Sequence, residues 1–133
     1  DFCLSRGLGD VYKRQGRARR MIFVAEARVP TDNAARYAIQ TGKHWAHNLA
    51  VEEAGEARII TFPKDARGAN WPGDARVTLA PEEGCLLCRI EASAEGQRDG
   101  LKGAVQRHVD RFAFREAPLV YAWTDCTSEP KPA

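Results

Sequence analysis

The chain has 133 residues, with 20 lysines and arginines against 18 aspartates and glutamates, which makes a formal net charge of +2. Its length suits one domain with a single packed core. No apolar run approaches the roughly 20 residues that a membrane-spanning helix needs, and no secretory signal is recognisable, so we expect a cytoplasmic protein without a membrane partner.

The first 20 residues differ from the rest. Residues 1–15 closely resemble a peptide that recurs at the ends of unrelated reading frames, as translated sequencing-library sequence does, and Met21 directly precedes the first strand-like run. We therefore expect residues 1–20 to be a non-native or disordered leader, residues 21–124 to form one domain and residues 125–133 to be a flexible tail. Without the leader, 14 basic residues face 16 acidic ones, and this net charge of −2 argues against a nucleic-acid partner.

The predicted elements begin with a strand over residues 22–29, where apolar residues alternate until Pro30. Thr31 can cap a helix that follows, whereas Gly42 weakens the end of that helix because glycine costs about 1 kcal/mol relative to alanine. Lys43 and His47 belong to its wetter side. Its buried side is expected to carry Ala34, Tyr37, Ala38, Thr41, His44 and Trp45.

Two hairpins and a second helix follow. The hairpins pair residues 49–53 with 57–62 and residues 76–80 with 85–92. From about Glu95 the apolar residues return to helical spacing, and residues 119–123 are expected to form a last strand. The buried stripe of this second helix is expected to contain Leu101, Ala104, Val105, His108, Val109 and Phe112.

This order predicts an α+β fold. Strand, helix, hairpin, hairpin, helix and strand would form an antiparallel sheet of about six strands with two helices packed on one face, like a split β-α-β arrangement. If each helix follows one of two parallel central strands, the helices run in the same direction. Their C-terminal ends, and with them the three histidines, would then lie side by side.

The histidines at these helix ends are the main candidates for a site. His44 and His108 lie on the apolar stripes, and His47 lies toward the rim. A pocket between them, bordered by lysine and arginine, would suit a small anionic ligand carrying a carboxylate, hydroxamate or catecholate group. The alternative is a pair of buried histidines that only hold the fold. The candidate ligand-binding residues are Lys43, His44, His47, His108, Arg111 and Arg115.

Metal binding and catalysis are weaker alternatives. His44, His47 and His108 could together bind a divalent metal, but His44 is expected to point inward and His47 outward, so no cofactor is predicted. Cys85 and Cys88 are spaced like zinc ligands, yet residues three apart in a strand face opposite sides of the sheet. An enzyme would have to use His44 or His108 as a general acid or base, since no nucleotide-binding or hydrolase motif occurs.

The string from Arg111 to Arg115 superficially resembles an RNA-binding strand motif. Phe112, however, continues the stripe of a helix, and Phe114 is expected to plug the core, so neither ring is predicted to stack on a base.

Two motifs resemble a known bacterial family. Residues 35–47 combine an Ala-Arg-Tyr helix start with a His-aromatic-x-His end, and residues 108–116 read His-Val-Asp-Arg-Phe-Ala-Phe-Arg-Glu. Both are similar to the family catalogued as domain of unknown function 2218, over nearly all of residues 25–123. Relatives occur beside or fused to flavin-dependent siderophore-interacting proteins, so the resemblance implies a role in siderophore or iron metabolism and such a protein as a partner.

Together these patterns favour a small accessory or ligand-binding domain. A small enzyme acting through His44 or His108 is the second hypothesis, and an interaction module with purely structural histidines is the third.

Overall fold

The computed structural model describes residues 22–128, so the expected leader, residues 1–20, and residues 129–133 of the expected tail lie outside the described residues. The strands are β1 (Ile22–Pro30), β2 (Ala50–Ala54), β3 (Ala57–Phe62), β4 (Ala75–Glu82), β5 (Cys85–Ala92) and β6 (Thr124–Ser128). The helices are α2 (Ala34–Trp45) and α3 (Glu95–Phe112), with one 3-10 turn, η2 (Ala66–Gly68). Neither α2 nor α3 combines the length and the apolar character that crossing a membrane requires.

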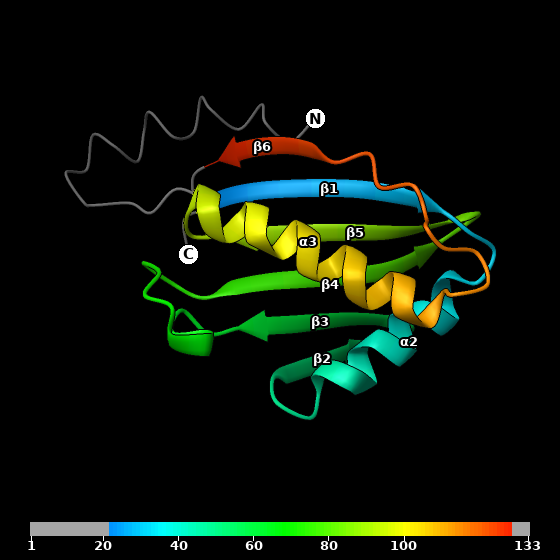
Figure 1. Ribbon diagram of the computed structural model, residues 1–133, viewed down its shortest axis with the longest axis horizontal. Coiled ribbons are helices and arrows are strands. Elements are labelled where there is room, and N and C mark those ends of the chain that lie inside the picture. The colour runs from blue at the N-terminus through cyan, green and yellow to red at the C-terminus, as the bar shows by residue number, and fades with distance from the viewer. Residues whose placement is uncertain (1–21, 129–133) are drawn as a thin grey trace.

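The six strands form one sheet in the order β2-β3-β4-β5-β1-β6, and every neighbouring pair is antiparallel. Both helices cover the same face of this sheet (Figure 1). Because neighbours alternate in direction, β5 and β6 point the same way with β1 between them, and α3 connects them. The predicted α+β fold with a split β-α-β arrangement is confirmed.

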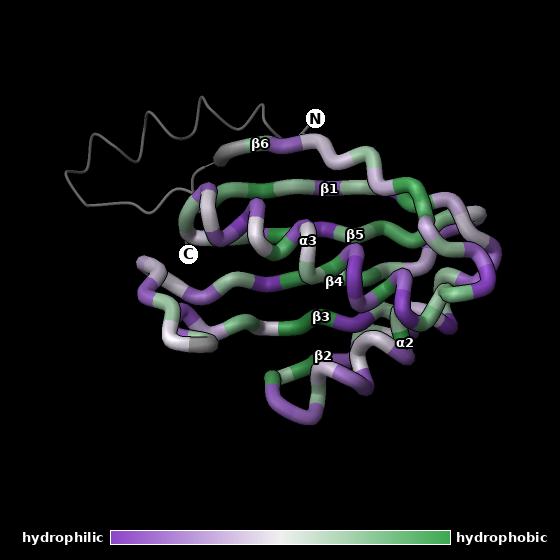
Figure 2. The backbone as a smooth tube through the Cα atoms, in the orientation of Figure 1, coloured by the Kyte–Doolittle hydropathy of each residue, from purple (hydrophilic) through white to green (hydrophobic). Residues whose placement is uncertain are grey.

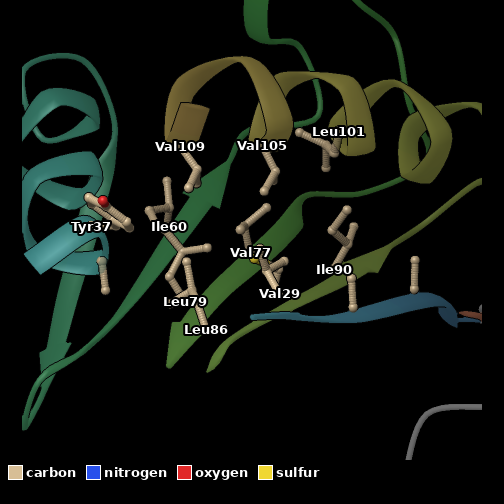
Figure 3. Packing of buried hydrophobic residues seen from close by; sticks show 14 of the residues in the cluster. Val29, Tyr37, Ile60, Val77, Leu79, Leu86, Ile90, Leu101, Val105 and Val109 are labelled. Atoms are coloured by element: carbon tan, nitrogen blue, oxygen red, sulfur yellow. The ribbon is translucent and has the colours of Figure 1, made fainter. Parts of the chain in front are cut away.

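The core lies between this sheet face and the two helices. Alternate residues of β5, among them Leu86 and Ile90, are fully buried, whereas the intervening ones are only partly covered. Helix α3 contributes Val105 and Val109, which point toward the sheet (Figure 3). The hydropathy colouring shows the same separation, with apolar colour concentrated in the central strands and polar colour recurring along α3 (Figure 2). One packed face is what this alternation predicts for an antiparallel sheet.

The expected direction of the helices is wrong. Helix α2 follows β1 and α3 follows β5, but β1 and β5 are antiparallel neighbours, so the helices run in roughly opposite directions (Figure 1). The segment after α3 therefore meets the start of α2. There the Glu116 carboxylate accepts hydrogen bonds from Asn33 Nδ2 at 2.9 Å and from the Tyr37 hydroxyl.

The ends of α2 also differ from the prediction. The cap position is Asn33 rather than Thr31, whose hydroxyl accepts a hydrogen bond from the Asn33 backbone at 3.1 Å. Gly42 is buried against the stem of Arg58, since a Cβ at this position would lie 2.8 Å from Arg58 Cγ. Close packing of α2 on β3 thus explains the glycine. The helix ends at Trp45, which leaves His47 in the turn beyond it.

The last strand is displaced from its expected place. Residues 119–123 belong to no described helix or strand, and β6 begins at Thr124 instead. The segment packs on α3, where the Tyr121 hydroxyl donates to Asp110 Oδ1 at 2.8 Å. Asp125, expected in the flexible tail, lies in β6, and its Oδ1 forms an ion pair with Lys102 Nζ at 2.7 Å.

Candidate functional site

A cleft of about 640 Å³ opens between the C-terminal end of α2, one side of α3 and the loop that follows β3. Its lining residues come from α2, α3 and the segments that follow α2 and β3. Both helices lie on the same face of the sheet (Figure 1). It is lined by His44, Trp45, Asn48, Leu49, Phe62, Pro63, Ala66, Trp71, Gly96, Gln97, Gly100, Leu101, Ala104, Arg107 and His108.

Aromatic rings form much of this lining. Trp45 meets Phe62 edge to face with ring centroids 5.2 Å apart, and it lies 4.7 Å from the ring of His108. Trp71 rests on the first turn of α3, because a Cβ at Gly96 would lie 3.0 Å from its ring. Rings fixed by such contacts offer flat apolar surfaces to a ligand.

Helix α3 lines the cleft partly with residues that have almost no side chain. Gly96, Gly100 and Ala104 are spaced four residues apart, so they lie on one face of the helix, and all three line the cleft. A Cβ at Gly100 would have no neighbouring atom within 4 Å. The cleft therefore exists partly because these positions carry almost no side chain.

A small polar network holds the loop in place. Ser93 Oγ donates to the Gly73 carbonyl at 2.9 Å, and Gln97 Nε2 donates to the same carbonyl at 3.0 Å. Gln97 Oε1 in turn accepts from the Ser93 backbone N–H at 2.8 Å. Gln97 is thus engaged in fixing the loop that carries Trp71 against α3.

The two histidines on the helices meet at the cleft. The rings of His44 and His108 have centroids 5.2 Å apart, and both side chains are partly buried. Burial lowers the pKa of His44, and the neighbouring His108, Arg111 and His47 lower it further. His44 is therefore neutral at pH 7, which lets it donate or accept a hydrogen bond.

Arg107 supplies positive charge to the cleft. Its side chain is exposed and makes no ion pair with any residue in the described range 22–128. None of the described residues that line the cleft is acidic. The arrangement can attract an anion.

Comparison with family models assigns the chain to one family. The family model described as "Uncharacterized protein conserved in bacteria (DUF2218)" matches residues 26–124. The chain belongs to this family. The NMR structure of PA4090 from Pseudomonas aeruginosa is similar to this DUF2218 protein, with 26% identity and a TM-score of 0.59 over 77% of this chain and 95% of that one. None of the curated proteins compared with the chain matches it.

The predicted site residues are divided by the structure. His44 and His108 line the cleft of this DUF2218 protein, whereas Lys43, His47, Arg111 and Arg115 are exposed and do not line it. His47 lies outside because α2 ends before it. Within residues 22–128, no three His, Cys, Asp or Glu side chains lie close enough to hold a metal ion, so the three histidines form no such group.

The residues beyond α3 also lie away from the cleft. The guanidinium of Arg115 sits 5.7 Å from the centre of the Phe114 ring. Phe114 is 70% exposed, so the expectation that it plugs the core is wrong. The chain passes from α3 to Glu116 over the surface at this point, and Ala113 takes the buried position instead.

Sequence reasoning missed several residues of the site. Arg107 lies next to His108 but off the apolar stripe, and Trp71 lies in a loop that has no periodicity. The signal that could have indicated them is the spacing of Gly96, Gly100 and Ala104. Small residues every four positions along an exposed side of a helix indicate that something packs or binds there.

Proposed function

We propose that this protein binds a small organic anion that has a flat apolar part. The observation that carries the proposal is an arginine without an ion-pair partner among the described residues, set in an aromatic cleft that has no acidic lining residue. A volume of about 640 Å³ lies within the range of small-molecule sites. The rings would cover the apolar part, and the Arg107 guanidinium would pair with the acid group.

The family resemblance adds a first choice of ligands. Siderophores hold iron with catecholate or hydroxamate groups; a catecholate combines negative charge with a flat ring, whereas a hydroxamate carries the charge without the ring. An accessory role in siderophore or iron metabolism, with a siderophore-interacting protein as partner, would fit a small domain whose cleft takes such a group. Free and ferric forms of a catecholate and of a hydroxamate siderophore therefore belong in the first ligand panel.

The test uses the full chain and three simple probes followed by NMR shifts of the backbone amides. Benzoate has both the ring and the charge, benzamide keeps the ring without the charge, and acetate keeps the charge without the ring. We expect saturable shifts of residues around the cleft with benzoate and much weaker ones with the other two probes. Absence of saturable binding by benzoate and by both siderophore classes would refute the proposal.

A charge variant locates the binding. Arg107→Gln is expected to weaken benzoate binding about tenfold, which corresponds to about 1.4 kcal/mol. Arg111→Gln is the matched control, because Arg111 is an exposed arginine one turn further along α3 that does not line the cleft. Equal losses in the two variants would show that general charge, rather than this site, drives the interaction.

A further inference from the structure

The orientation of His108 is fixed by a hydrogen bond to its own helix. His108 Nδ1 lies 2.7 Å from the carbonyl oxygen of Ala104. A carbonyl oxygen can only accept, so Nδ1 carries a proton and donates it. In the neutral imidazole, Nε2 is then left as an acceptor.

This second nitrogen has no partner among residues 22–128. The one fully buried side-chain nitrogen or oxygen without a partner in that range is Thr41 Oγ1, so His108 Nε2 is accessible. The ring that carries it lines the cleft and contacts the rings of Trp45 and His44. The cleft therefore combines an unpaired cation, Arg107, with an oriented hydrogen-bond acceptor from the next residue.

We infer that the ligand of this cleft carries a hydroxyl group in addition to its acid group, as hydroxylated aromatic acids do. The inference rests on the proposed function, because it assumes that an aromatic anion binds at Arg107. Its additional content is that the hydroxyl donates to His108 Nε2. A site with a fixed acceptor favours a ligand that donates to it, since an analogue without the donor leaves the nitrogen desolvated and unpaired.

The test compares benzoate with 2-, 3- and 4-hydroxybenzoate and with the three corresponding methoxybenzoates. Each ether keeps the ring, the charge and the oxygen but cannot donate. We expect one hydroxybenzoate to bind the full chain about fivefold more tightly than both benzoate and its own ether. This preference should disappear in His108→Phe, which keeps a ring, and should persist in His47→Phe, which changes an exposed histidine outside the cleft.

Nitrogen NMR of the unmodified protein gives an independent reading that needs no variant to fold. At pH 8 the His108 ring should show a protonated Nδ1 and an unprotonated Nε2. The Nε2 signal should move with the preferred hydroxybenzoate and stay in place with its ether. A proton on Nε2 instead of Nδ1, or a hydroxybenzoate preference that persists in His108→Phe, would overturn the inference.

The possible failures are distinguishable. If benzoate binds in a manner that depends on Arg107 but no hydroxybenzoate exceeds its ether, the anion site stands and the hydroxyl inference falls. If no aromatic acid binds, the hydroxyl inference falls, and the anion site falls with it when neither siderophore class binds.

Discussion

Glu116 offers the sharpest test of how the two helices are held together. Its carboxylate accepts hydrogen bonds from Thr31 Oγ1 at 3.0 Å, from Asn33 Nδ2 at 2.9 Å and from the Tyr37 hydroxyl. These three donors lie at or near the N-terminal end of α2, where a negative charge is also favoured by the helix dipole. The hydrogen bonds from Tyr37, Asn33 and Thr31 hold the pKa of Glu116 below its usual value.

Glu116→Gln keeps the shape of the side chain but removes the charge and turns one acceptor into a donor. A hydrogen bond to a charged group contributes about 1.5 to 3 kcal/mol where water is excluded, but Glu116 is exposed, so water compensates for part of the loss. We expect the free energy of unfolding to fall by about 1 to 2 kcal/mol. For a domain of this size, each kcal/mol should lower the melting temperature by about 4 to 8 °C.

The pH dependence of the free energy of unfolding provides a second test of the Glu116 interaction. Because the folded-state pKa of Glu116 is lowered, its contribution is present above the unfolded pKa, near 4.5, and is lost as pH falls through the lower folded value. Wild type and Glu116→Gln should therefore differ in urea unfolding at pH 7 and converge in strong acid. Glu83→Gln, an exposed residue in the β4–β5 turn, serves as control. Equal stability of the two variants at pH 7 would refute the reasoning.

Three further predictions concern α2 and α3. Thr41→Val should raise the free energy of unfolding by about 1 kcal/mol in urea titrations, because it removes a buried hydroxyl without a partner; any loss would contradict this. The pKa of His44 is lowered in the folded protein, so as the pH falls the unfolded state gains a proton at this residue before the folded state does. The free energy of unfolding should therefore fall between about pH 7.5 and 5.5, and it should fall less in His44→Asn. By calorimetry, Gly100→Ala should stabilise α3 by about 1 kcal/mol, whereas Gly96→Ala should gain less because its Cβ meets Trp71.

The parts of the fold that repeat locally could be predicted from the sequence. Alternation located β1, β3 and β5, and the stripe ending in Trp45 located α2. Residues 119–123 have the pattern of a strand but do not form one. Leu119, Tyr121 and Trp123 are half-buried while their neighbours are exposed, which is the alternation of a strand. The partners of this segment are side chains of α3 rather than a neighbouring strand, and local sequence does not encode the partner.

The site, like the fold, could be predicted from the sequence only in part. The stripes placed His44 and His108 facing inward, and the structure brings their rings together. The reason expected for their meeting was parallel helices, which is wrong, because the antiparallel pairing of β1 with β5 joins residues about 60 positions apart in the chain. Arg107 could not be assigned in advance, since its role depends on where the loop carrying Trp71 packs.

Two polar clamps hold the elements that surround the cleft, and this arrangement links stability to binding in a specific way. Glu116 fastens the end of α3 to the start of α2, while Gln97 fastens the loop to the start of α3. Neither clamp uses the faces of Gly100 and His108 that line the cleft. A ligand that binds the folded state and not the unfolded state should raise the melting temperature. Glu116→Gln should lower the melting temperature and leave the affinity for benzoate unchanged, because it loosens the helix pair outside the ligand's contacts.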